Sequence, residues 1–164
     1  MKILYFGGQK SGKTSLSITK TFEIAKDEKP IYIATYLDNY DDKEMKKRIS
    51  NHQIERKDDF ITIEEGLDLD SVLDTNKTYL IDCISMWLLN NIEKTEKMLI
   101  SEIQKVMNTQ NNIIFIINDV SSGIIPLDTI SRKFVDLTGI IGQEIAKSCD
   151  EVYQVNYGIQ RRIK

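Results

Sequence analysis

Residues 7–14 read Gly-Gly-Gln-Lys-Ser-Gly-Lys-Thr and match the pattern G-x-x-x-x-G-K-[ST] at every position. They follow a short apolar run and precede a stretch with helical spacing, which is the context of a loop that binds phosphate. The glycines let backbone N–H groups curl toward phosphate oxygens, and the following helix directs its positive end at the same anion. Lys13 is expected to contact the β- and γ-phosphates, and Thr14 to bind Mg²⁺. The segment predicts that the chain binds a nucleoside triphosphate with Mg²⁺.

Beyond this loop, short apolar runs alternate with longer amphipathic stretches along the 164 residues. Strands are expected at residues 2–6, 31–35, 60–63, 78–82, 113–117 and 151–155, with a weaker candidate at 159–163. Helices are expected at residues 14–25, 41–53, 85–91 and 96–109, and along the apolar stripe Ile130, Phe134, Leu137, Ile141 and Ile145. Several strands are apolar on both faces, as in a parallel sheet covered by helices on each side. The pattern predicts one α/β domain over residues 1–164, a three-layer P-loop NTPase (RecA-like) fold whose mostly parallel sheet has about six or seven strands.

The charge and the cysteine content exclude several classes of protein. The 22 Lys and Arg residues against 25 Asp and Glu residues give a net charge of −3. Polynucleotide-binding proteins usually carry a basic surplus, so nucleic acid is not an expected partner. The two cysteines cannot form a disulfide framework, which favours a reducing cytoplasm. Because the longest apolar run, residues 113–117, has only the length of a buried strand, no membrane span is predicted and a cytoplasmic location is expected.

A second site residue is predicted at the end of an apolar strand. Residues 78–82 read Thr-Tyr-Leu-Ile-Asp, and P-loop domains place the acid that holds Mg²⁺, directly or through water, at such a strand end. Asp82 therefore joins Thr14 as a predicted metal-binding residue. The Asn-Lys-x-Asp motif with which signalling GTPases read guanine is absent, since the nearest segment, residues 118–121, reads Asn-Asp-Val-Ser.

His52 is the only histidine of the chain. On the expected helix it shares a face with Met45 and Ile49, with Arg48 one turn before it and Arg56 one turn after. Two neighbouring cations disfavour the imidazolium form, so we expect a neutral and therefore nucleophilic imidazole. The same spacing also fits a half-buried histidine without a catalytic role on a solvated helix. The residues alone do not favour the nucleophile over this structural interpretation.

Taken together, these segments resemble the bifunctional adenosylcobinamide kinase / adenosylcobinamide-phosphate guanylyltransferase family of cobalamin biosynthesis. The tract through His52 and the Asp-Cys-x-x-x-Trp segment that begins at Asp82 are much more specific than the phosphate loop. The matching positions are residues 7–14, 32–35, 42–45, 48–52, 62–64, 81–88 and 123–126, with Arg56, Arg132, Phe134, Asp136, Gly139 and Gln143.

The resemblance implies a homotrimeric enzyme that uses ATP and GTP with Mg²⁺ and acts on a corrinoid. It implies phosphorylation of adenosylcobinamide and transfer of GMP from GTP to the product, giving adenosylcobinamide-GDP and pyrophosphate. By position, His52 would be the nucleophile that carries GMP. The implied nucleotide-binding residues are Gly7, Gly8, Gln9, Lys10, Ser11, Gly12, Lys13, Thr14, Ala34, Thr35, Arg48, Gln53, Arg56, Glu64 and Asp82.

Four positions depart from the family pattern, all in the C-terminal half. Asp119 and Ser121 stand where the family has Glu and Gly, Val135 replaces an Arg, and Gly142 replaces an Asn. These differences affect the expected kinase step and corrinoid recognition more than guanylyl transfer, so guanylylation is expected to be the better preserved activity.

We expect two residues near Asp82 to serve in ordinary packing. Trp87 is expected in the core, with contact to a corrin or a second subunit as the alternative. Cys83 is expected to be a small buried residue and not a nucleophile. Two alternative functions stay open: a P-loop kinase of another small metabolite, and a nucleotide-dependent assembly subunit without transferase chemistry.

Overall fold

The computed structural model describes residues 1–37, 59–120 and 122–164. Within them, seven strands form one sheet in the order β3-β2-β4-β5-β1-β6-β7. The strands are β1 (Lys2–Gly7), β2 (Ile31–Ala34), β3 (Ile61–Glu64), β4 (Thr78–Asp82), β5 (Asn112–Asn118), β6 (Glu151–Asn156) and β7 (Ile159–Arg162). All neighbours are parallel except β6 and β7, which form an antiparallel hairpin. The predicted mostly parallel sheet is confirmed.

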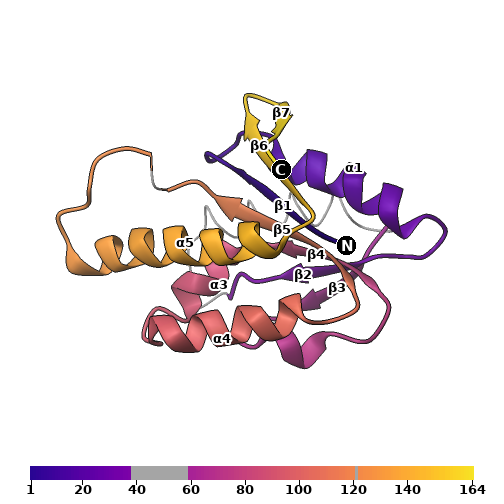
Figure 1. The fold of residues 1–164 in the computed structure, drawn as a ribbon, viewed down its shortest axis with the longest axis horizontal. Coiled ribbons are helices and arrows are strands. Elements are labelled where there is room, and N and C mark those ends of the chain that lie inside the picture. Colours follow the sequence, from indigo (N-terminus) through magenta and orange to yellow (C-terminus); the bar gives the residue numbers. More distant parts are fainter. Residues whose placement is uncertain (38–58, 121) are drawn as a thin grey trace.

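Helices cover both faces of this sheet, with α1 on one face and α3, α4 and α5 on the other (Figure 1). The helical elements of the described residues are α1 (Lys13–Ala25), the 3₁₀ helix η1 (Leu69–Val72), α3 (Ile84–Asn90), α4 (Glu96–Met107) and α5 (Thr129–Ser148). The helix predicted at residues 41–53 lies outside the described residues. None of the described helices has the length and apolar character needed to cross a bilayer.

The alternation of side chains along the strands supplies both halves of the core. In β5, Ile113, Phe115 and Ile117 face the cluster under α3, α4 and α5, whereas Ile114 and Ile116 face the cluster under α1. This two-sided burial is the reason why the strand is a continuous apolar run in the sequence.

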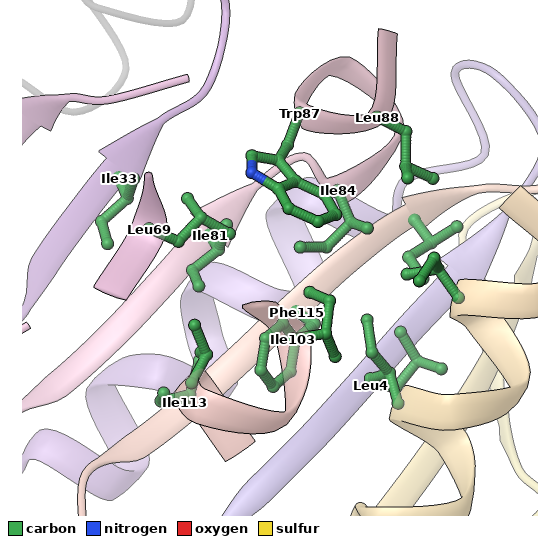
Figure 2. Close-up of a cluster of buried hydrophobic side chains, with 14 of the residues drawn as sticks. Leu4, Ile33, Leu69, Ile81, Ile84, Trp87, Leu88, Ile103, Ile113 and Phe115 are labelled. Atoms are coloured by element: carbon green, nitrogen blue, oxygen red, sulfur yellow. The ribbon is translucent and has the colours of Figure 1, made fainter. Parts of the chain in front are cut away.

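Trp87 of α3 lies in the larger of these two clusters and is 1% exposed. Figure 2 shows its indole ring beside Ile84, above the strand side chains. Its ring nitrogen donates a hydrogen bond to the Leu67 carbonyl oxygen at 3.1 Å. The core interpretation of Trp87 is confirmed.

The apolar stripe predicted for the last helix is buried only in part. Leu137, Ile141 and Ile145 are buried in the cluster that α5 shares with α3 and α4, and Phe134 packs against it. Ile130 is 64% exposed because the first turn of α5 lies before the part of the helix that packs on the other elements. The predicted helix is confirmed, and its spacing shows which residues share a face without revealing where the tertiary contacts of that face end.

The connections between strands place the phosphate loop at a reversal of strand order. α1 leads from β1 to β2 past β5 and β4, whereas α5 leads from β5 to β6 past β1 on the opposite face. In open α/β sheets, ligands bind beyond the carboxyl ends of the strands at such a reversal. The end of β1, where residues 7–14 begin, lies at this point.

Candidate nucleotide-binding site

The phosphate loop leaves β1 through a crowded turn. A Cβ atom on Gly7 would lie 2.2 Å from the Val155 carbonyl oxygen of the neighbouring strand β6, so only glycine fits there. Gly12 has a φ of 93°, a left-handed conformation that glycine adopts without a steric penalty, and α1 begins at the next residue. The two outer glycines of the motif therefore have separate structural reasons, close packing at Gly7 and backbone conformation at Gly12.

Lys13 is buried at the start of α1, with 6% of the residue exposed. Its ammonium group donates a hydrogen bond to the Gly8 carbonyl oxygen at 3.1 Å and so spans the loop. Burial lowers the pKa of Lys13 from its usual 10.5, and the negative charge of Asp82 opposes that shift. The lysine is thus held at the loop within electrostatic reach of the carboxylate predicted to bind metal.

Asp82 ends β4 on the sheet face that α1 covers, because it follows Leu80 by two residues and Leu80 packs in the cluster under α1. The Tyr32 hydroxyl of β2 donates a hydrogen bond to one oxygen of the Asp82 carboxylate. Tyr32 itself is 1% exposed, whereas Asp82 and Thr14 are half-buried. One carboxylate oxygen is therefore held by a buried hydroxyl at the ligand edge of the sheet.

The Ser11 hydroxyl oxygen in the middle of the loop is buried and has no hydrogen-bond partner in the protein. Buried polar atoms of folded proteins are nearly always paired. An unpaired hydroxyl inside a phosphate-binding loop fits a group whose partner is supplied by a ligand.

Thr35 links β2 to the segment after β4 by hydrogen bonds of its hydroxyl group. That hydroxyl donates to the Cys83 carbonyl oxygen and accepts from the Cys83 backbone N–H, both at 2.8 Å. The Thr35 carbonyl oxygen accepts from the Asn90 side chain at 2.7 Å. Because Thr35 is 0% exposed and its polar groups are paired in this way, its evident role is to fix the backbone beside Asp82.

Ala34 and Glu64 lie at the same edge on the two strands beyond β4. Ala34 is in register with Asp82 on one side and with Glu64 on the other. Glu64 is exposed, and Ala34 is half-buried. The edge therefore presents Glu64, Ala34 and Asp82 in a row from β3 to β4.

Asn118 was not predicted as a site residue, although it ends β5, the strand between β4 and β1. Its backbone N–H donates to the Ser85 hydroxyl at 2.9 Å, and its side-chain amide lies 3.7 Å from the Cys83 sulfur. The next N–H along the chain, that of Asp119, donates to the Gly7 carbonyl oxygen at 2.8 Å. A polar residue at the end of an otherwise apolar run was the available signal.

Cys83 is buried beside Asp82, and burial raises the pKa of its thiol to about 12, with the charge of Asp82 acting in the same direction. A thiol in that environment stays protonated at neutral pH, so it is neither a nucleophile nor a metal ligand there. The sequence-based interpretation of Cys83 as an inert packing residue is confirmed.

The twelve predicted site residues that the structure describes lie at one edge of the sheet. They are residues 7–14 of the loop with Ala34, Thr35, Glu64 and Asp82. His52, Arg48, Gln53 and Arg56 lie outside the described residues, so their assignment stays a prediction from the sequence.

The chain has a phosphate loop with a buried lysine, and a carboxylate at the end of another strand of the same mostly parallel sheet. These features define a RecA-like P-loop NTPase domain. The family model described as cobinamide kinase / cobinamide phosphate guanyltransferase matches residues 3–163. The chain belongs to this family of enzymes.

Two relatives with similar sequences match this chain over nearly all of their length. The bifunctional adenosylcobalamin biosynthesis protein CobP of Pseudomonas aeruginosa is 29% identical, with 100% of this chain and 98% of the relative covered. The bifunctional adenosylcobalamin biosynthesis protein CobU of Escherichia coli is 27% identical, with 100% of both chains covered. A solved structure from Pyrococcus horikoshii OT3 shares the fold with a TM-score of 0.54 at 10% identity, over 99% of this chain and 85% of that one.

Proposed function

We propose that the chain catalyses two successive transfers in cobalamin biosynthesis. The first moves a phosphoryl group from ATP or GTP to the hydroxyl group of adenosylcobinamide. The second moves GMP from GTP to the resulting phosphate and gives adenosylcobinamide-GDP and pyrophosphate. The observation that carries the proposal is the phosphate loop itself, in which buried Lys13 donates to the Gly8 carbonyl oxygen, in a chain whose family is named for these two reactions.

The residues at the loop fit a Mg²⁺ ion that arrives with a nucleotide. Mg²⁺ is commonly bound by one or two protein oxygens together with substrate phosphates and water. Thr14 offers a hydroxyl at the start of α1, and Asp82 offers the carboxylate that Tyr32 holds. When bound, the ion would neutralise charge on the β- and γ-phosphates. The described residues contain no group of three His, Cys, Asp or Glu side chains placed to hold a metal by themselves.

The loop residues would bind and orient the phosphates in both reactions. Backbone N–H groups between Gly7 and Gly12 supply hydrogen bonds, and the N-terminus of α1 adds the positive end of its dipole. The Lys13 ammonium would exchange its contact with the Gly8 carbonyl oxygen for phosphate oxygens. In the guanylyl transfer, the same groups would stabilise pyrophosphate as it leaves.

His52 is proposed as the nucleophile of the second reaction. A neutral imidazole nitrogen attacks the α-phosphorus of GTP, so that a P–N bond forms while the bond from the α-phosphorus to the bridging oxygen breaks and pyrophosphate leaves. A phosphate oxygen of adenosylcobinamide phosphate then displaces the imidazole and takes the GMP group. Arg48 and Arg56 would offset the charge of the triphosphate as it approaches.

Labelling with GTP that carries radioactive phosphorus at the α-position tests this chemistry. We expect a protein-bound label that is released by acid and survives alkali, as a phosphorus–nitrogen bond requires. His52→Ala should abolish the label while retaining the circular dichroism spectrum and the affinity for inorganic tripolyphosphate, because the loop is untouched.

Each other outcome has a defined meaning. A label that persists in His52→Ala contradicts the histidine mechanism. Turnover of ATP labelled at the γ-phosphate without any label from GTP supports the simple kinase of another metabolite. Tight nucleotide binding with neither reaction supports the assembly subunit.

Three of the four departures from the family pattern are described, Asp119 after β5 and Val135 and Gly142 in α5, whereas Ser121 lies outside the described residues. Asp119 donates its N–H to the Gly7 carbonyl oxygen, and its carboxylate accepts from the Ser122 hydroxyl at 3.1 Å. Val135 lines a hollow with Arg132, and a Cβ on Gly142 would meet only Ile117, at 4.0 Å. Guanylyl transfer is proposed as the better preserved activity because all four departures lie in the C-terminal half of the sequence, away from the tract through His52. Phosphorylation of adenosylcobinamide without incorporation of GMP would reverse that ranking.

The proposal includes a corrinoid as the substrate partner, no nucleic-acid partner, a cytoplasmic location and a homotrimer. Light scattering on the purified chain tests the oligomer, for which a mass of three chains of 18.9 kDa each is expected. A mass of one or two chains would contradict it.

A further inference from the structure

β5 runs between the strand that leads into the phosphate loop and the strand that ends in Asp82 (Figure 1). Its last residue, Asn118, is in register with Gly7, the first residue of the loop. On the other side, Asp82 is in register with Ile116, two residues before Asn118. Asn118 therefore ends the strand that separates the loop from the carboxylate predicted to bind metal.

The side chain of Asn118 lies on the face of the sheet that α1 covers. Ile114 and Ile116 of the same strand pack in the cluster under α1, and the alternation of side chains places Asn118 on their side. Its amide nitrogen lies 3.7 Å from the sulfur of Cys83, which belongs to that same cluster. The amide consequently shares this face with Asp82 and with the start of α1.

The Cys83 sulfur links the Asn118 amide to the lysine of the loop. Burial raises the pKa of the Cys83 thiol to about 12, and the charge of Lys13 opposes that shift. Such an influence weakens with distance, so the Lys13 ammonium is within electrostatic reach of the sulfur that the amide contacts. The amide and the ammonium thus approach the same place from two neighbouring strands.

Within the described part of the chain, the Asn118 side chain has only a weak hydrogen-bond partner, because a thiol sulfur is a poor acceptor. The backbone around it is firmly held. The Asn118 N–H donates to the Ser85 hydroxyl at 2.9 Å, and the Asp119 N–H donates to the Gly7 carbonyl oxygen at 2.8 Å. A fixed backbone therefore presents a half-buried amide whose N–H groups can donate to a stronger acceptor.

The γ-phosphate of a triphosphate in the loop would supply that acceptor. The loop N–H groups surround the α- and β-phosphates, and a metal ion in such a site bridges oxygens of the β- and γ-phosphates. With Asp82 as the predicted metal ligand, the γ-phosphate would lie over the end of β5, between Lys13 and Asp82. Asn118 is the residue at that strand end.

We propose that the Asn118 side-chain amide donates a hydrogen bond to the γ-phosphate and so distinguishes a nucleoside triphosphate from a diphosphate. A hydrogen bond to an ionised phosphate oxygen is stronger than one to a neutral acceptor, so the amide would exchange its contact with the Cys83 sulfur for the phosphate. The inference rests on the proposed function, since it requires a triphosphate in the loop.

Two nucleotides that differ in the γ-phosphate test this contact. Calorimetry with Mg²⁺ compares a non-hydrolysable ATP analogue with ADP. Asn118→Ala removes a hydrogen bond to a charged group, so it should weaken binding of the analogue roughly 10-fold while changing the affinity for ADP by less than about two-fold. Asn118→Leu replaces the amide with an apolar side chain of similar shape that fills the space beside Cys83. It should lose affinity for the analogue to the same extent.

Asn112→Ala is the matched control, since Asn112 is a half-buried asparagine at the opposite end of the same strand. We expect it to bind both nucleotides like the wild type. Wild-type affinity of Asn118→Ala or of Asn118→Leu for the analogue overturns the contact, and so does an equal loss for both nucleotides. In these cases the wild type still binds nucleotide, and the proposed function stands. Failure of the wild type to bind either nucleotide overturns the proposed function together with the contact.

Discussion

The Tyr32 hydroxyl donates a hydrogen bond to the Asp82 carboxylate from the neighbouring strand of the sheet. Tyr32 pairs with Leu80 in the strand register, so its ring lies on the face from which Asp82 also projects. Groups that hold a metal ligand from behind orient it and adjust its basicity. Tyr32 is therefore a positioning residue for the carboxylate that we propose to hold Mg²⁺.

Tyr32→Phe should weaken the dependence of nucleotide binding on Mg²⁺ without removing the binding itself. The carboxylate loses the donor that orients it, and we expect the Mg²⁺ concentration for half-maximal binding of the ATP analogue to rise roughly 10-fold. Tyr79→Phe is the control, because Tyr79 is equally buried but its hydroxyl accepts from the Asp74 N–H at 2.7 Å. Identical Mg²⁺ titrations for the wild type and Tyr32→Phe would exclude a positioning role.

Gly7→Ala should lower the stability of the chain and Gly8→Ala should not, although the two glycines are neighbours in the loop. A Cβ on Gly7 would lie 2.2 Å from the Val155 carbonyl oxygen, whereas a Cβ on Gly8 meets nothing within 4 Å. Urea denaturation should show a loss of about 2–3 kcal/mol of unfolding free energy for Gly7→Ala, because the strands must move apart. Gly8→Ala should unfold like the wild type. Equal stabilities of the two variants would contradict the close packing of β1 against β6.

Glu151 should make the stability of the chain depend on pH. Burial alone would raise the pKa of Glu151, but the hydrogen bond from Tyr153 at 2.9 Å and the charges of Lys20 and Arg162 outweigh it and lower that pKa below 4.5. Because the folded state holds the ionised form more strongly than the unfolded state does, the contribution is complete above the unfolded pKa. It is lost as the pH falls through the folded pKa.

Glu151→Gln should therefore cost about 1–2 kcal/mol of unfolding free energy at neutral pH, and the difference from the wild type should shrink in acid. Urea titrations at a series of pH values measure this. Glu144→Gln is the control, since Glu144 pairs with a Lys147 side chain that is 76% exposed, and such pairs contribute little. A Glu151→Gln difference that stays constant through the acid range would contradict the charge-based account.

The two cysteines should resist thiol reagents while the chain is folded. Burial raises the pKa of Cys83 and of Cys149 to about 12, so the reactive thiolate is scarce at neutral pH. A chromogenic disulfide reagent should modify neither thiol in the native protein and both in denaturant. Rapid modification of the native protein, mapped to Cys83 by mass spectrometry, would contradict its inert role.

Much of the fold was predictable because its signals are local. Strand β5 could be recognised from an uninterrupted apolar run, and the turn after β1 could be recognised from Gly7 and Gly12. β7 was the weakest prediction, and it is the exposed strand that pairs antiparallel with β6. Because all four of its residues are exposed, that strand lacks the apolar pattern that marks the others.

The phosphate loop and the carboxylate of the candidate site could be predicted from the sequence. The groups that support them were harder to predict. Asp82 could be named because a strand end beside a phosphate loop is a local cue. The role of Tyr32 could not be predicted, because it depends on which strands are neighbours, and Asn118 was missed although its place at the end of an apolar run was a local signal. The role of His52 stays a prediction, since residues 38–58 lie outside those described.

Local sequence was sufficient for the class of fold, the phosphate loop and the alternation of strands and helices, because hydrophobic period and glycine placement act over a few residues. It was not sufficient for strand order, and strand order brings Tyr32 to Asp82, Thr35 to Cys83 and Gly158 to Ser11. The members of these three pairs lie between 48 and 147 positions apart in the chain. Contacts over such separations form only when the whole sheet assembles, which is why tertiary structure alone decided the surroundings of the nucleotide site.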